Sequence, residues 1–185
     1  MTILPRLELK LPEILPYKTY ITIHTKTGWS VYKEWDTSNW EKVVAAFPDE
    51  MFIQIGLPSD PKIAGCNHDY MNIPLMDSIA LITNAKLHLG IDSFSNHITH
   101  MSQTPAVILW GSTHYIGSGY PHNTNISLEL PCSPCYRENP GISSMSRGIC
   151  PNPPNQTYEN PRHACMTGIK VETVVEAIKQ LIYCA

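Results

Sequence analysis

The stretch that decides the fold reads LHLGIDSFSNHITHMSQTPAVILWGST and spans residues 87–113. It begins with a short apolar strand and ends with a second one at 106–110, and between the strands Asp92 and Ser93 can cap a short helix that carries His97. In an open parallel sheet, ligands bind outside the carboxyl ends of the strands, and a helix N-terminus there offers unpaired N–H groups to phosphate. The stretch therefore predicts a nucleotide-type pocket at one edge of a parallel sheet.

The sequence on the amino-terminal side of this stretch continues the same alternation. From Tyr20 to Gly111, apolar strands alternate with helical patterns, which is typical of βαβ units. The first buried strand is expected at 20–25, and one helix is expected to place Leu75, Ile79 and Ile82 toward the core. Ser38 and Glu41 have the spacing of a capping box, which predicts the start of one helix, and residues 171–182 predict an amphipathic closing helix. We therefore predict an α/β fold: a Rossmann-like, mostly parallel sheet with flanking helices.

Chain length and proline placement indicate the domain organisation. A chain of 185 residues is long enough for one domain with a sizeable core. Pro5, Pro12 and Pro16 mark residues 1–19 as a linker-like lead-in. We expect a single domain at 20–185, which includes an irregular proline-rich segment at 131–166.

Composition argues against several classes of partner. The formal net charge is −3 and 16% of the residues are charged, without the basic stripe that nucleic-acid binding requires. No apolar run approaches the roughly 18 residues of a membrane span, and residues 1–10 lack the pattern of a signal peptide. We therefore expect a cytoplasmic protein with no nucleic-acid partner and no membrane span.

Three common catalytic motifs are absent from the sequence. There is no Gly-x-Gly-x-x-Gly, no Gly-x4-Gly-Lys-Ser/Thr and no serine-nucleophile elbow. We therefore expect no nicotinamide or other redox cofactor, and no phosphoryl transfer of the P-loop type.

Cysteine spacing gives a second signal, in the segment 131–166. Four cysteines follow the pattern Cys132-x2-Cys135-x14-Cys150-x14-Cys165, where apolar periodicity is too weak to fold the chain by burial alone. A structural tetrathiolate centre would organise this segment, with zinc as the default metal and iron as its main competitor. The alternatives are two disulfides or unligated thiols, and disulfides are disfavoured without a secretory signal.

Several polar residues lie where the pocket is expected. Among the histidines, His97 and His114 lie near the predicted edge, and His97 either reaches a diphosphate or bonds a backbone carbonyl. Lys33 can pair with phosphate and Trp35 can cover a base or a sugar, although an exposed lysine is more often only solvated.

These motifs together resemble a known family. Lys33-Glu34-Trp35 followed by Trp40, then Ile55-Gly56-x-Pro58, 86–97 and 107–113 resemble, in order and spacing, the carboxyl-terminal half of family 9 glycosyltransferases of the heptosyltransferase type. The resemblance runs from about Tyr20 to the end of the chain. The four-cysteine tail is similar to that of the autotransporter heptosyltransferase branch, whose members carry an iron-binding finger, and this shifts the preferred metal toward iron.

The resemblance implies a fold, a ligand and a set of site residues. The family has the two-domain GT-B architecture, in which the carboxyl-terminal domain holds a nucleotide sugar, usually an ADP-heptose. By motif position, Thr25 and Thr27 would lie near the phosphates and Lys33 would balance their charge. The sugar-diphosphate site would be lined by Asp92, Ser93 and His97. The nucleoside would face Ser59 or Asp60. Such a site works by donors preorganised around the leaving diphosphate, without a metal at the reaction centre.

Two departures from the family pattern bear on function. Phe94 and the run Gly111-Ser112-Thr113-His114 replace the family's usual residues, which weakens the implication of ADP-heptose in particular. The family's amino-terminal domain, which supplies the acceptor site and the catalytic base, has no counterpart in this chain. Catalytic residues are therefore not assigned.

Two functions remain open. The first is the donor-binding half of an inverting glycosyltransferase, which acts when an acceptor domain is supplied in trans or by a longer parent chain. The second is a non-catalytic remnant of the fold that binds a partner protein or forms a homo-oligomer, because a freed interdomain face would be an apolar patch.

Overall fold

The computed structural model describes residues 19–28, 31–130, 133–134 and 164–184. Its centre is one sheet of six strands in the order β3-β2-β1-β4-β5-β6, and every neighbouring pair is parallel. The strands are β1 Ile21–His24, β2 Phe52–Gly56, β3 His68–Met71, β4 Leu87–Ile91, β5 Ala106–Trp110 and β6 Thr124–Ser127. The parallel α/β fold predicted from the sequence is confirmed.

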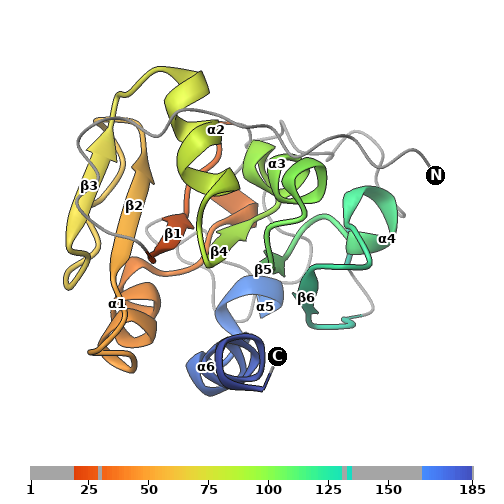
Figure 1. Ribbon diagram of the computed structural model, residues 1–185. Coiled ribbons are helices and arrows are strands. Elements are labelled where there is room, and N and C mark those ends of the chain that lie inside the picture. Colours follow the sequence, from red (N-terminus) through yellow and green to blue (C-terminus); the bar gives the residue numbers. More distant parts are fainter. Residues whose placement is uncertain (1–18, 29–30, 131–132, 135–163, 185) are drawn as a thin grey trace.

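Helices cover both faces of this sheet, as Figure 1 shows. They are η1 Val31–Lys33 (a 3-10 turn), α1 Thr37–Ala45, α2 Leu75–Thr83, α3 Phe94–Ser102, α4 Tyr115–Ser118, α5 Ala164–Thr167 and α6 Val171–Tyr183. Helices α1 and α6 pack together on one side, and α2 and α3 pack together on the other. None of the helices in the described ranges is long and apolar enough to cross a membrane.

The strand order creates a topological switch between β1 and β4. The chain moves outward from β1 through β2 to β3, and then returns to add β4, β5 and β6 on the other side of β1. Because the connections leave β1 and β4 in opposite directions, a crevice opens between their carboxyl ends. This is the edge at which the sequence predicts a ligand.

The main core lies between the sheet and the helices α1 and α6. Its largest fully buried members include Trp40 of α1, and the predicted closing helix contributes Val174 and Ile178 of α6. A smaller cluster lies on the opposite face, where Leu81 and Ile82 of α2 pack on the sheet. The central strands are thus covered on both faces, as parallel sheets require.

Local signals were less accurate than the overall pattern. The capping-box prediction at Ser38 is wrong, because α1 begins at Thr37 with Asp36 as its N-cap residue. Leu75 was expected to face the core, but it is 62% exposed at the first position of α2. Strand β6 was not predicted, because among its four residues, Thr124–Ser127, only Ile126 is apolar.

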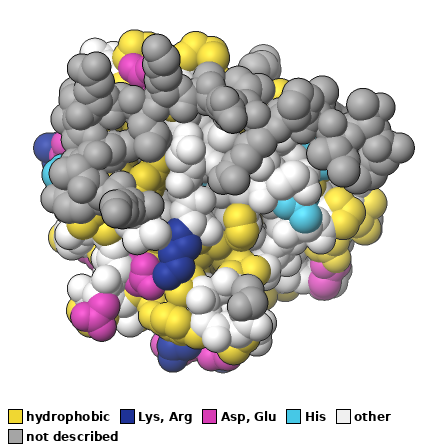
Figure 2. Space-filling model, in the orientation of Figure 1, with side chains coloured by type: hydrophobic (Ala, Val, Ile, Leu, Met, Phe, Trp, Pro, Cys, Tyr) yellow, Lys and Arg dark blue, Asp and Glu magenta, His cyan; other side chains and the backbone are white. Residues whose placement is uncertain are grey.

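Charges on the face shown in Figure 2 do not gather by sign. Among the described side chains there, acidic and basic groups are scattered between apolar ones.

Candidate functional site

A pocket of about 980 Å³ opens at the carboxyl ends of β1, β2 and β4. Segments that follow four strands, β1, β2, β3 and β4, form its walls, and the N-terminus of α3 forms part of them. The lining residues are His24, Lys26, Thr27, Gly28, Lys33, Glu34, Ile55, Gly56, Leu57, Ser59, Asp60, Asn72, Ile73, Leu75, Ser78, Asp92, Ser93, Phe94 and His97. The pocket therefore lies at the topological switch, where nucleotides bind in folds of this class.

An ion pair joins the two loops on either side of the switch. Lys33 Nζ lies 2.6 Å from Asp92 Oδ2, and both side chains are at most 13% exposed. The Thr113 hydroxyl donates to the same oxygen at 2.6 Å. Asp92, directly after β4, is thus held by residues that follow β1 and β5. The pair presents a cation and a carboxylate together on the pocket wall.

A second cation lies on the pocket wall beside its own carboxylate. Lys26 Nζ lies 2.5 Å from Glu34 Oε2, and Glu34 Oε1 accepts the backbone N–H of Thr27 at 3.4 Å. On the β2 side, Asp60 accepts the backbone N–H of Leu57 at 2.8 Å. A side chain at Gly56 would collide with the Asp60 carboxylate, so a glycine is needed where this turn closes.

A chain of hydrogen bonds links the end of β1 to the start of α3. His24 Nδ1 lies 3.1 Å from Ser93 Oγ, which lies 2.9 Å from Ser95 Oγ. Ser93 occupies the N-cap position of α3, as predicted, but its hydroxyl makes no capping bond to the helix backbone. Burial lowers the pKa of His24 to about 4, against a smaller opposing effect of the Asp60 charge. His24 is therefore neutral at physiological pH.

His97 lies at the pocket rim on α3. Its side chain is exposed, and Nδ1 forms a 2.8 Å hydrogen bond with the Tyr120 hydroxyl. The Tyr120 ring stacks on His100 of the same helix at a centroid distance of 3.8 Å. The hydrogen bond to Tyr120 holds the His97 ring through Nδ1 and leaves its other nitrogen, Nε2, for a ligand.

The structure gathers most of the predicted binding residues around one pocket. Seven of them are Thr27, Lys33, Ser59, Asp60, Asp92, Ser93 and His97, and all of these line it. Thr25 is buried and is not among the lining residues. The role of these residues in binding a nucleotide sugar stays a prediction.

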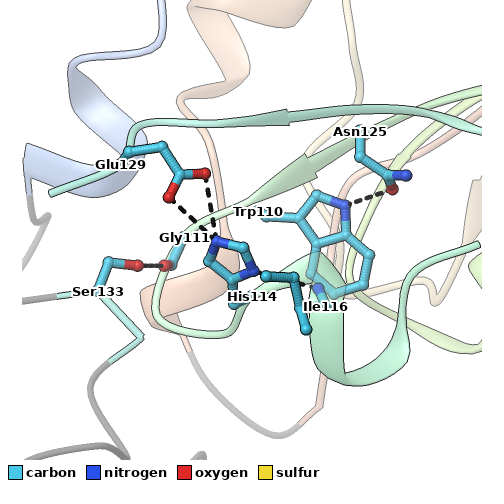
Figure 3. A network of polar contacts seen from close by, with 7 residues as sticks. All are labelled: Trp110, Gly111, His114, Ile116, Asn125, Glu129 and Ser133. Carbon is cyan, nitrogen blue, oxygen red and sulfur yellow. Dashed lines mark hydrogen bonds and ion pairs between the residues drawn. The ribbon is translucent and has the colours of Figure 1, made fainter.

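Two residues that the sequence placed near the pocket lie elsewhere. Trp35 is 2% exposed and packs edge-on against Trp40 in the main core, so it does not cover a ligand. His114 is buried outside the pocket, where its Nδ1 accepts the backbone N–H of Ile116 and its Nε2 faces Glu129 at 3.2 Å (Figure 3). Both residues serve the fold: the Trp35 ring is buried in the main core, and the two ring nitrogens of His114 have partners outside the pocket.

His24 is one of the pocket residues that sequence reasoning missed, together with the Lys26–Glu34 pair. It was assigned to the buried strand 20–25, whose alternation gives no sign that its last member reaches a ligand edge. The available signal was its position, because the last residue of a strand beside the switch lies at the crevice.

Of the four predicted metal ligands, Cys132, Cys135 and Cys150 lie outside the described residues. Cys165 is described, and it is 4% exposed at α5. Within the described ranges, no group of three or more His, Cys, Asp or Glu side chains could hold a metal ion.

The two described segments next to these cysteines meet at Gly111, just beyond β5. Ser133 donates its hydroxyl to the Gly111 carbonyl at 2.6 Å (Figure 3). Met166 lies so close to Gly111 that a side chain there would collide with it. Residues adjacent to Cys132 and to Cys165 therefore contact the same glycine.

Solved heptosyltransferases share this fold. The dodecameric iron-containing heptosyltransferase TibC, in complex with ADP-D-beta-D-heptose, aligns with a TM-score of 0.73 and 18% identity over 95% of this chain and 48% of its own. TibC comes from enterotoxigenic E. coli H10407. The E. coli ADP-heptose lps heptosyltransferase II aligns with a TM-score of 0.63 and 15% identity, over 91% of this chain and 48% of its own.

A third solved structure, a family 9 glycosyl transferase from Veillonella parvula DSM 2008, has a TM-score of 0.65 and 16% identity over 93% of this chain and 48% of its own. This chain thus spans about half the length of the structures it matches. No family model and no curated protein sequence matches it. At such identities the likeness shows the fold alone, which is the Rossmann-like fold of the GT-B glycosyltransferases.

Proposed function

We propose that this chain is the donor-binding half of a family 9 glycosyltransferase, and that its pocket holds a nucleotide diphosphate sugar of the ADP-heptose type. The observation that carries the proposal is the Lys33–Asp92 ion pair on the pocket wall at the topological switch. The solved structures of the same fold that bind ADP-heptose support the choice of ligand.

The pocket offers three kinds of group to such a ligand. The first turn of α3 lies beside the site that follows β4, and the positive dipole end of the helix there suits a diphosphate. Lys33 supplies a positive charge that a diphosphate would share with Asp92. Asp92 retains acceptor capacity for the sugar hydroxyls, because a carboxylate has about four lone-pair sites.

The reaction that fits these groups is inverting transfer of the sugar away from the diphosphate. As the bond to the sugar breaks, negative charge grows on the departing phosphate, and donors already in place stabilise it. The acceptor and the base that deprotonates it would come from an acceptor domain, either in trans or in a longer parent chain. We assign no catalytic residue within this chain.

Titration calorimetry with ADP, UDP, GDP and ADP-heptose tests the proposal. We expect ADP and ADP-heptose to bind, and Lys33→Met to weaken both by about tenfold, the effect of losing one charge-assisted contact. Lys62→Met is the matched control, because Lys62 is exposed on the surface and pairs with Asp69 outside the pocket. Failure of every nucleotide to bind at millimolar concentration would contradict the proposal.

A second candidate, a protein-interaction module, is favoured by the apolar rim of the pocket. Leu57, Leu75 and Phe94 line the opening with exposed fractions of 60%, 62% and 38%. Exposed apolar side chains grouped at one opening favour a covering partner, either an acceptor domain or a second copy of the chain. Light scattering separates the two functions, because a strict monomer that binds ADP-heptose contradicts a role in self-assembly.

We also propose that Cys132, Cys135, Cys150 and Cys165 hold one structural iron or zinc ion, as in the autotransporter heptosyltransferase branch. The meeting of Ser133 and Met166 at Gly111 supports this set, because it brings both flanks of the four-cysteine segment to one place. Four thiolates leave no open coordination position for a substrate.

Elemental analysis of protein purified without chelator tests the metal proposal. It should find one iron or zinc ion per chain, and Cys150→Ser should lose it. Cys66→Ser is the control, because Cys66 is a free thiol outside the pattern. Metal-free wild-type protein would contradict the proposal.

A further inference from the structure

We infer that His24 is a binding residue of this pocket, whose Nε2 donates a hydrogen bond to a phosphoryl oxygen of the nucleotide diphosphate. Ser93 acts as the positioning residue that orients the His24 ring. The inference rests on the proposed function, since it names a contact to the same ligand.

The position of His24 places it at the centre of the ligand edge. It is the last residue of β1, in register with Gly90 of β4, and these are the two strands on either side of the switch. Its ring lines the pocket together with the residues that follow β4. A side chain here lies beside the N-terminus of α3, where the proposed function places the diphosphate.

The His24 ring is held from two sides before any ligand arrives. Ser93 Oγ lies 3.1 Å from Nδ1, and the Phe94 ring meets the imidazole edge-on at a centroid distance of 5.0 Å. Ser93 is itself tied to Ser95 Oγ at 2.9 Å. A ring fixed in this way loses little further freedom when it contacts a ligand, which favours binding.

The other ring nitrogen of His24, Nε2, has no hydrogen-bond partner among the described residues. Within the part of the chain that the structure describes, the His24 side chain has a hydrogen bond with Ser93 and a ring contact with Phe94, and neither uses Nε2 in a hydrogen bond. His88, on the same sheet face, provides a contrast: its Nε2 is also unpartnered, but it is sealed from solvent. The Nε2 of His24 is not sealed in this way, so it is available to the occupant of the pocket.

The hydroxyl chain is compatible with a proton on either ring nitrogen of His24, because each serine hydroxyl can donate or accept. Because the ring is neutral at physiological pH, it holds one proton, on Nδ1 or on Nε2. When Ser95 donates to Ser93 and Ser93 donates to Nδ1, the proton lies on Nε2. A phosphoryl oxygen accepts hydrogen bonds and donates none, so it selects this arrangement. His24 then acts as a donor that needs no counter-ion, unlike Lys33.

A matched pair of substitutions tests the contact. In His24→Gln the amide nitrogen reaches about as far as Nε2, so a donor to the ligand is retained. In His24→Asn the amide reaches only as far as Nδ1, so the link to Ser93 is retained and the donor to the ligand is lost. We expect His24→Asn to weaken ADP binding by about tenfold, and His24→Gln to stay within about threefold of the wild type.

The protonation state of Nε2 distinguishes a direct contact to the ligand from a purely structural role of His24. In protein with ¹⁵N-labelled histidine, the nitrogen shift of His24 Nε2 should take the value of a protonated ring nitrogen when ADP is added. In Ser93→Ala the free ring should show a mixture of both tautomers. An Nε2 that stays unprotonated in the ADP complex overturns the inference.

Calorimetry separates failure of this inference from failure of the proposed function. If wild-type protein binds ADP and both His24 variants bind it equally well, the His24 contact is wrong and the donor pocket stands. If wild-type protein binds neither ADP nor inorganic pyrophosphate, the proposed function fails and the inference fails with it. The expected result is that ADP binds, that His24→Asn loses about tenfold in affinity, and that His24→Gln restores it.

Discussion

The two faces of the strands β1 and β4 are built from opposite chemistry. On the face toward α1 and α6, alternate residues are aliphatic and fully buried: Ile21, Ile23, Leu87, Leu89 and Ile91. On the face toward α3, the positions between them carry Thr22, His24 and His88, which are also buried. Because successive side chains of a strand point to opposite faces, one pair of strands supplies a hydrophobic core and a polar layer.

Burial on these two faces serves two purposes. The aliphatic face gains its stability from area removed from water, which is non-directional. The polar face must satisfy its groups individually, and Thr22 Oγ1 does so with His88 Nδ1 at 2.9 Å. Only the polar layer ends in the pocket, through His24. We therefore expect changes on the first face to act on stability, and changes on the second to act on pH dependence and binding.

The largest effect is expected on the aliphatic face. Leu89→Ala should lower the free energy of unfolding by about 3 kcal/mol, because it removes a fully buried side chain and leaves a cavity. Leu75→Ala is the control, since Leu75 is 62% exposed and should change stability by less than about 0.5 kcal/mol. Urea denaturation measures both. A loss below about 1 kcal/mol for Leu89→Ala would show that the aliphatic face does not gain its stability from tight packing.

The next effect is a pH dependence that comes from the polar face. Burial lowers the pKa of His88 to about 3 and that of His24 to about 4. Below pH 6.5 the unfolded chain therefore binds protons that the folded protein does not, so stability is lost as the pH falls through this window. Between pH 7.5 and pH 5 each histidine should contribute a loss of about 2 kcal/mol in the free energy of unfolding.

Urea denaturation of His88→Gln at the two pH values checks the sign and the source of this effect. The variant cannot take up the proton, so its stability should change less between pH 7.5 and pH 5 than that of the wild type. An equal loss in both proteins would assign the acid sensitivity to other groups.

A smaller effect should follow from the hydrogen bond within the polar layer. Thr22→Val preserves shape but leaves His88 Nδ1 without its partner, which should cost about 1 to 2 kcal/mol of unfolding free energy. Thr22→Ser keeps the hydroxyl and separates the lost hydrogen bond from the lost methyl group. If the Val variant were as stable as the wild type and the Ser variant were not, packing and not polarity would govern this face.

The sequence predicted the fold better than the site because apolar patterns report burial and polar patterns do not. Strand 106–110 was predicted with its exact bounds, since five apolar residues stand between a Thr-Pro step and a glycine. His24 and His114 show the limit. Each is a buried histidine at the end of a strand or loop, and only the three-dimensional arrangement shows that the first reaches the pocket and that the second caps α4.

Resemblance carried information that physical patterning alone did not. Lys33 lies 59 positions before Asp92 in the chain, and no local rule joins them into one ion pair. Motif order placed both in one pocket, and the structure places them in contact. Position in the loop after the first strand was not enough for Trp35, because a tryptophan next to a pocket lysine can face the core instead.

The smallest effect is expected at the polar pair outside the pocket, His114 and Glu129. Glu129 is 67% exposed on its side chain, so solvent screens its charge and the pair contributes little to stability. Glu129→Gln keeps an oxygen that can accept from His114 Nε2, and it should lower the free energy of unfolding by less than about 1 kcal/mol. His114→Ala should cost more, because it also removes the acceptor for the Ile116 N–H at the start of α4. Urea denaturation measures the loss in the free energy of unfolding for both variants. A larger loss for Glu129→Gln than for His114→Ala would show that the ion pair itself stabilises the fold, as the buried polar groups on the α3 side of the sheet do.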